Sequence, residues 1–270
     1  MASVLEIKDL TVKYHTEENG TVTADRAVCL NAEAGRITGI IGFSGSGKTS
    51  LMLAVMGLLP KEAEIESGTV KFQGTDITVS AFPDLLAHDT FMSGIRGKDM
   101  CMIFQNPMSY FDPTVKIGAQ IAEVLRNHRK CGWFESRRMA AEMLAALNVP
   151  DAKKVCRRYP IEVNGGLLQK AAIAIGLANK PKLLIADEPF SALDAENTAL
   201  VCERFEELKD QGSAVIVILH DLCTAERLCD DIAVMNNGEI VELGTAAEVM
   251  NNPQSEYTKE LIEFAKETDE

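Results

Sequence analysis

Short apolar runs and amphipathic segments alternate along this chain. Residues 36–41, 182–186 and 214–219 are largely apolar and bounded by polar residues, as expected for parallel strands covered by helices on both faces. Residues 3–35 and about 68–78 instead predict short strands, and hence a flanking antiparallel sheet. Turn signals stand at 18–20 and 73–75. The pattern predicts an α/β protein with two kinds of sheet.

Between these regions, residues 86–180 predict an inserted helical lobe. Segments 117–126, 136–147 and 167–178 carry apolar residues at intervals of three and four positions, the spacing of an amphipathic helix. Because no repeat or long linker interrupts the chain, we expect one domain over residues 1–270. Residues 1–85 and 181–270 would form its core and antiparallel subdomain.

The last part of the sequence predicts a hairpin and a helix. Residues 232–235 and 240–243 flank Asn237-Gly238, a dipeptide suited to a tight two-residue turn. Thr245 and Glu248 have the spacing of a capping box, which predicts a helix start.

Composition narrows the class of protein. The charge is −13, with 40 acidic and 27 basic residues, which argues against a nucleic-acid partner. No apolar stretch approaches the roughly 18 residues of a membrane span, and the first residues lack the basic start of a signal peptide. The seven cysteines contain no C-x-x-C pair, so we expect reduced thiols in a cytosolic protein. Cys223 and Cys229 are expected to be packing residues.

A glycine-rich segment directly follows the first apolar run. Residues 42–49 fit the pattern G-x-x-x-x-G-K-[ST] in its required strand–loop–helix setting, which predicts that the chain binds ATP or GTP. Gly42, Gly45 and Gly47 allow successive N–H groups to point at one phosphate chain, next to the positive end of a helix.

The side chains of this loop strengthen the prediction. Lys48 is expected to reach the β and γ phosphates, and the Thr49 hydroxyl to ligate Mg²⁺. We also expect the nucleotide-binding site to include Ser44, Ser46 and Ser50. The alternative is a glycine-rich turn without a ligand, which gives Lys48 and Thr49 no packing role.

Two carboxylates end the second apolar run. Burying Asp187 and Glu188 is costly unless a cation or a reaction uses them. Asp187 is suited to holding Mg²⁺, and Glu188 to polarising the water that attacks the γ-phosphate. Alternatively, Asp187 caps the helix after Pro189, which leaves Glu188 without a role.

Two further residues are candidates for the same reaction. His220 follows the third apolar run and could donate a hydrogen bond to a phosphate oxygen, because ligands gather at the carboxyl ends of parallel strands. Gln105 could touch Mg²⁺ or the attacking water. The alternatives are a structural histidine and an ordinary loop glutamine.

A second helix start is suited to an anion. Asn164 is a good N-cap, and Gly165 and Gly166 would expose backbone donors in the first turn. The alternative is a plain capped helix. If this helix end binds phosphate, one nucleotide can hardly use both ends on different lobes, so a pair of chains would be needed.

Six motifs resemble, in order and spacing, those of the ATP-binding subunits of ABC transporters over essentially the whole chain. They are the Walker A loop 42–49, the glutamine loop at Gln105, the signature 163–169, Walker B at 183–188, the D-loop 191–194 and the switch His220. The resemblance implies a P-loop NTPase core with a parallel sheet, a flanking antiparallel β subdomain and an inserted helical subdomain. It also implies ATP and Mg²⁺ as cofactors, with Asp194 at the nucleotide and Tyr14 stacked on adenine. A core tyrosine on a strand face is the alternative for Tyr14.

Within that family, the sequence is most similar to the dipeptide, oligopeptide and nickel importers. Residues 104–108, 111–113 and 252–261 carry this similarity. It implies an ATPase at the cytoplasmic face of the cell membrane, working with a second ATP-binding subunit, two transmembrane permease subunits and an extracytoplasmic solute-binding protein. The cargo would be a peptide, nickel or a metal chelate. Longer members carry a cysteine-containing extension, and its absence here favours the shorter nickel or metal-chelate type.

Three positions depart from the family pattern. Phe43 stands where this group often has glutamate, and it is expected to supply only its backbone. Leu167 occupies another tolerant position. Asn164 replaces the usual serine and is longer, so the site that this signature completes is expected to be slower or regulatory. The site built on Lys48 and Glu188 should be competent if a partner supplies a good signature.

Two other functions are compatible with a P-loop. A soluble ABC ATPase of repair or cluster assembly would often carry coiled-coil insertions or tandem cassettes, and this sequence shows neither. A non-hydrolysing nucleotide-dependent regulator is disfavoured by the retention of Glu188 and His220.

Overall fold

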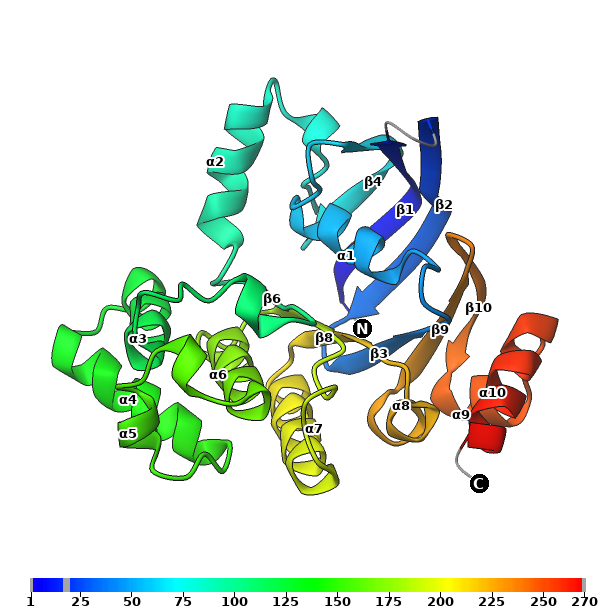
Figure 1. The fold of residues 1–270 in the computed structure, drawn as a ribbon. Helices are drawn as coiled ribbons and strands as arrows, with labels where there is room; N and C mark the ends of the chain where they lie inside the picture. Colours follow the sequence, from blue (N-terminus) through cyan, green and yellow to red (C-terminus); the bar gives the residue numbers. More distant parts are fainter. Residues whose placement is uncertain (1, 17–19, 269–270) are drawn as a thin grey trace.

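A six-stranded sheet forms the centre of the computed structural model, which describes residues 2–16 and 20–268 (Figure 1). The strand order is β10-β9-β3-β8-β7-β6, and all neighbours pair in parallel except the β9–β10 hairpin. The strands are β3 (Arg36–Ile41), β6 (Met100–Ile103), β7 (Leu183–Asp187), β8 (Ala214–Ile218), β9 (Asp231–Asn236) and β10 (Glu239–Thr245).

The three predicted parallel strands are confirmed as β3, β7 and β8, with ends within one residue of the expected ones. The sequence reading missed β6, which pairs with β7. Four residues are too few to establish a period. The segment predicted as the helical lobe, 86–180, therefore also supplies one strand to the central sheet.

A second, four-stranded sheet has the order β2-β1-β4-β5 and is antiparallel, as predicted. Its strands are β1 (Ser3–Thr16), β2 (Gly20–Glu33), β4 (Ala63–Phe72) and β5 (Thr75–Asp76). β1 and β2 are longer than expected, because register shifts interrupt one continuous pair and break the alternation of the sequence. The expected turn at 18–20 lies mostly outside the described residues.

Helices cover the central sheet and build a lobe beside it (Figure 1). Segments predicted as helices are confirmed in α3, α4 and α6, whereas α2 and α5 had no separate prediction. The helices are α1 (Lys48–Met56), α2 (Leu85–Ile95), α3 (Ile117–His128), α4 (Trp133–Ala146), α5 (Ala152–Val155), α6 (Gly165–Leu177), α7 (Ala195–Asp210), α8 (Leu222–Leu228), α9 (Ala246–Asn251) and α10 (Glu256–Thr268). Short 3-10 turns lie at Val79–Ala81, Pro107–Ser109 and Pro160–Glu162.

Alternate residues of the central strands enter two different cores. Ile37 and Ile41 of β3 pack with the helical lobe and with α7 and α8, while Ile40 packs with α1 and the antiparallel sheet. The sheet is therefore buried on both faces, which explains why its strands are continuously apolar in sequence.

The predicted hairpin and capping box are confirmed. Asn237 and Gly238 have φ angles of 48° and 83°, the left-handed values that a two-residue primed turn requires. The Thr245 hydroxyl accepts the Glu248 N–H, and the Glu248 carboxylate accepts the Thr245 N–H at 3.1 Å.

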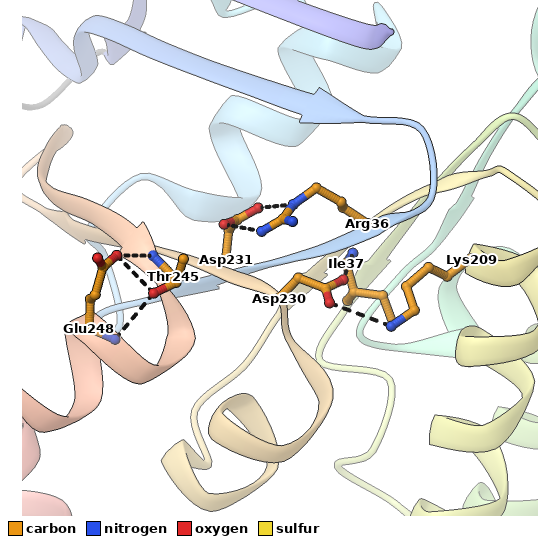
Figure 2. A network of polar contacts seen from close by, with 7 residues as sticks. All are labelled: Arg36, Ile37, Lys209, Asp230, Asp231, Thr245 and Glu248. Carbon is orange, nitrogen blue, oxygen red and sulfur yellow. Dashed lines mark hydrogen bonds and ion pairs between the residues drawn. The ribbon is translucent and has the colours of Figure 1, made fainter. Parts of the chain in front are cut away.

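A polar clamp joins the beginning of β3 to β9 and α7 (Figure 2). Arg36 donates two hydrogen bonds to the Asp231 carboxylate, at 2.6 and 2.5 Å. The neighbouring Asp230 accepts the Ile37 N–H at 2.8 Å and lies 3.5 Å from the ammonium of Lys209. These contacts fix the register of β9 against β3 at the amino-terminal ends of the two strands, opposite the loop that follows β3.

The cysteine prediction is partly wrong. Among residues 2–16 and 20–268, no cysteine forms a disulfide, and Cys229 is buried as expected. Cys223, in contrast, is exposed on α8.

In the described part of the chain, residues 2–16 and 20–268, no helix has the length and apolar character needed to cross a membrane.

We predict that Asp230→Ala lowers the free energy of unfolding by about 1–3 kcal/mol, because it leaves the buried Ile37 N–H without an acceptor. Denaturant unfolding monitored by circular dichroism measures this. The control is Glu142→Gln, which breaks an exposed pair with Arg138 and should cost about 0–0.5 kcal/mol. Equal losses for both variants would contradict the role of the clamp.

Candidate active site

The glycine-rich loop connects β3 to α1, as predicted. Gly42 has a φ of +149°, and a Cβ placed on it would lie 2.2 Å from the carbonyl oxygen of Met235. Gly47 has a φ of +106°, and its added Cβ would lie 2.5 Å from a carboxylate oxygen of Asp25. Only glycine fits at these two positions, so the backbone path of the loop is fixed by its neighbours.

Lys48 lies inside the loop and is 5% exposed. Its ammonium donates to the carbonyl oxygens of Gly42 and Phe43 at 2.8 and 2.9 Å, and to the Ser46 hydroxyl at 3.2 Å. Burial lowers the pKa of Lys48, an effect that Glu188 and Asp187 partly counter. The loop thus encloses one cation that faces two carboxylates.

Thr49 and Asp187 meet across the site. The Thr49 hydroxyl donates to Asp187 Oδ2 at 2.8 Å. The helix after Pro189 is α7, whose N-cap is Asp194 and not Asp187. Asp187 is buried, and its other oxygen, Oδ1, has no hydrogen-bond partner among the described residues. Burial raises the pKa of Asp187, while the Thr49 hydrogen bond lowers it. An unpartnered carboxylate oxygen beside a hydroxyl fits Mg²⁺, which binds proteins through few oxygen ligands.

Glu188 is held from two sides. Gln105 Nε2 donates to Glu188 Oε2 at 2.6 Å, and His220 Nε2 contacts Glu188 Oε1. The Glu188 backbone has a φ of +47°, a strained conformation for this residue type. Its N–H donates to the Ile218 carbonyl at 3.1 Å, so the end of β8 supports the strained turn. His220 thus lies beside the end of β7, as the sequence predicted, and Gln105 contacts the same carboxylate.

Tyr14 lies at the border of this site. Its ring is partly buried against the core of α1 and the antiparallel sheet, and its hydroxyl accepts a hydrogen bond from Ser50 at 3.3 Å. Ser44 and Gly45 are exposed in the loop, whereas Ser46 is buried beneath it.

The signature residues lie in the helical lobe. Asn164 caps α6 by accepting the Leu167 N–H at 2.9 Å, and Gly165 and Gly166 form the first turn. A hollow of about 470 Å³ joins Asn164 and Gly166 to Asp194. None of residues 42–49, 187 or 188 lines this hollow.

The comparisons with known proteins agree with this geometry. The family model for ABC transporter matches residues 26–191. This chain belongs to the ABC transporter family. The dipeptide transport ATP-binding protein DppD of Lactococcus lactis subsp. cremoris is 40% identical over 262 residues, which span 96% of this chain and 73% of that protein. The oligopeptide transport ATP-binding protein OppD of Bacillus subtilis is 37% identical over 96% of this chain and 71% of its own length.

A solved structure shares the fold of this ABC protein. The ATP-binding cassette MJ0796, a dimer bound to ADP and Pi, has a TM-score of 0.78 at 23% identity over 90% of this chain and 98% of that chain. The predicted fold class is confirmed, and the chain is a nucleotide-binding ATPase.

Two residues next to the site were missed by the sequence reading. Tyr257 of α10 contacts the glycine-rich loop at Phe43. Asp25 of β2 lies under Gly47 and is 0% exposed, and neither carboxylate oxygen is hydrogen-bonded among the described residues. A charge at an inward position of a strand is the signal that could have revealed Asp25. Burial raises the pKa of Asp25 to about 7, and the nearby Ser50 hydroxyl only partly offsets this.

Asp25→Asn is predicted to stabilise the protein at pH 8, with a gain that shrinks as pH falls from 7 towards 4. The folded-state pKa of Asp25 lies above its ordinary value of 3.8, so ionisation opposes folding fully above pH 7 and not at all below the unfolded-state pKa. The cost is at most roughly 4 kcal/mol. Thermal melts across this pH range measure it, with the exposed Glu226→Gln as the control. A gain independent of pH would contradict a buried, titrating Asp25.

Proposed function

We propose that this ABC ATPase powers the uptake of peptides through two transmembrane permease subunits. The observation that best supports ATP hydrolysis is the position of the Glu188 carboxylate, which is held between Gln105 and His220 beside the loop 42–49. Peptides are the proposed cargo because the relatives reported above are a dipeptide and an oligopeptide transport protein. Nickel or a metal chelate is the less supported cargo. Uptake of labelled dipeptides and of nickel by cells with and without this chain distinguishes them.

In the proposed site, each loop residue has one task. Lys48 redirects its ammonium from the loop carbonyls to the β and γ phosphates, while the backbone from Ser44 to Thr49 surrounds them. Thr49 and Asp187 hold Mg²⁺, with Gln105 as a further candidate ligand. Bound Mg²⁺ supplies charge neutralisation on the phosphates. Tyr14 stacks on the base.

Glu188 is proposed as the general base. Its carboxylate accepts a proton from the attacking water, which is the only step at this site that needs a proton acceptor. Gln105 and His220 orient that carboxylate through their contacts with its two oxygens. His220 is also placed to donate to a γ-phosphate oxygen.

We propose that a second ABC ATP-binding subunit completes the site. The hollow that joins Asn164 to Asp194 contains no residue of the phosphate loop, so its donors serve a nucleotide held by another chain. The proposed assembly also includes an extracytoplasmic solute-binding protein. Nucleic acid is not among the proposed partners. This chain, as a single domain over residues 1–270, would be peripheral to the cell membrane on its cytoplasmic face.

Glu188→Gln is predicted to lower ATP hydrolysis at this chain's site at least 100-fold while ATP binding persists, because the amide keeps the shape and removes the proton acceptor. The variant should accumulate as an ATP-bound dimer. Phosphate release and size-exclusion chromatography with ATP measure these outcomes. Unchanged hydrolysis, in a complex whose other site is inactive, would reject the role of Glu188.

Asn164→Ser is predicted to change hydrolysis at the partner's phosphate loop and to leave this chain's own site nearly untouched. The reason is that the N-terminus of α6 opens into a hollow separate from Lys48 and Glu188. ATPase rates are measured in complexes with an inactivated base on one chain at a time. If hydrolysis changes at this chain's own site instead, the proposal that each chain completes the nucleotide site of its partner is wrong.

A further inference from the structure

Phe43 occupies the middle of an aromatic cluster between the phosphate loop and the last helix. Its ring lies edge-on to Tyr257, with centroids 5.8 Å apart, and edge-on to Phe264, with centroids 5.7 Å apart. The sequence reading expected Phe43 to supply only its backbone. Its side chain instead connects the loop 42–49 to α10, which lies more than 200 positions later in the sequence.

The backbone of Phe43 is held at both ends. Its N–H donates to the Tyr257 hydroxyl at 3.0 Å, and its carbonyl oxygen accepts from the Lys48 ammonium at 2.9 Å. Tyr257 therefore holds the N–H of Phe43, and the carbonyl oxygen of the same residue holds the ammonium of Lys48.

α10 is itself anchored firmly enough to act as a support. Just before its first turn, the Glu242 carboxylate of β10 accepts the N–H groups of Gln254 and Ser255 at 2.8 and 3.0 Å. Leu261 and Ile262, on one face of the helix, are buried in the hydrophobic core that also includes residues of α8 and α9. The position of Tyr257 is thus set by β10 and by the core, not by the loop.

We propose that Tyr257 is a positioning residue for the phosphate-binding loop, and that α10 thereby sets the affinity of this chain for ATP. The inference rests on the proposed role of the loop 42–49. The Tyr257 hydroxyl and ring hold Phe43 in the conformation that aims the following N–H groups and Lys48 inward. Without this support, the loop must lose conformational freedom when phosphate binds, so binding weakens. The chemical step, carried by Glu188, is unaffected.

The test compares variants of Tyr257 in the full chain and in the assembled complex. Tyr257→Phe removes the acceptor and keeps the ring, so we expect the Kd and KM for ATP to rise roughly two- to tenfold, the effect of one hydrogen bond. Tyr257→Ala removes both contacts and should raise them further. In both variants kcat should remain within about twofold of wild type. Isothermal titration calorimetry and steady-state ATPase assays measure these values.

Matched variants separate positioning from general stability. Glu260→Gln changes an exposed residue of the same helix and should leave Kd, KM and the melting temperature unchanged. Phe43→Ala removes the ring that packs against Tyr257 and should weaken ATP binding as Tyr257→Phe does. If Tyr257→Ala does not fold, Tyr257→Phe decides alone.

Two results would overturn the inference: an unchanged Kd in Tyr257→Phe, or a fall in kcat without a change in KM. Lys48→Ala distinguishes this failure from a failure of the proposed site. If Lys48→Ala binds ATP normally, the loop is not the phosphate site; if it abolishes binding while the Tyr257 variants bind normally, only the role of α10 is wrong.

Discussion

Charged side chains buried where parallel strands end impose the main constraint on this structure. Lys48 and Asp187 are both nearly inaccessible to water. Lys48 begins α1 after the loop that follows β3, and Asp187 is the last residue of β7. Burial disfavours their charged forms, so each depends on close partners. The loop carbonyls and Ser46 supply those of Lys48, and Thr49 supplies one for Asp187. The order of the central strands places β8 between β3 and β7, so the carboxyl ends of these three strands lie side by side.

Rigid elements surround this polar site. The clamp of Arg36 with Asp231, and of Asp230 with Ile37 and Lys209, fixes the opposite end of β3. The Asp25 carboxylate lies close to Gly47 and the Met235 carbonyl oxygen close to Gly42, so only glycine fits at these two positions of the loop. α10 holds the loop from outside through Phe43. The loop is therefore defined by contacts with three distant segments as well as by its own sequence.

The separation of the signature from the phosphate loop has a physical consequence for assembly. A helix N-terminus attracts anions only within about its first turn, and the exposed end of α6 shares its hollow with Asp194, not with Lys48. A single chain therefore separates the signature helix end from its own glycine-rich loop. In the proposed assembly, a second ATP-binding chain would bring each of these parts against its complement and so couple nucleotide binding to association.

The sequence by itself determined the parts of this protein whose information is local. The loop 42–49, the strands β3, β7 and β8, the Asn237-Gly238 turn and the Asn164 cap were all predicted correctly. Each depends on neighbouring residues through backbone geometry, apolar periodicity or capping chemistry. The ordered motifs likewise identified the family and its nucleotide.

Only the tertiary structure decided what distant segments do to one another. It placed Gln105 and His220 on opposite oxygens of Glu188, buried the Asp25 carboxylate beneath Gly47, added β6 to the central sheet and brought Tyr257 to Phe43. No local pattern encodes these contacts, because each depends on packing between elements far apart in the chain. A variable loop position such as Phe43 acquires a role only when the fold supplies its neighbour.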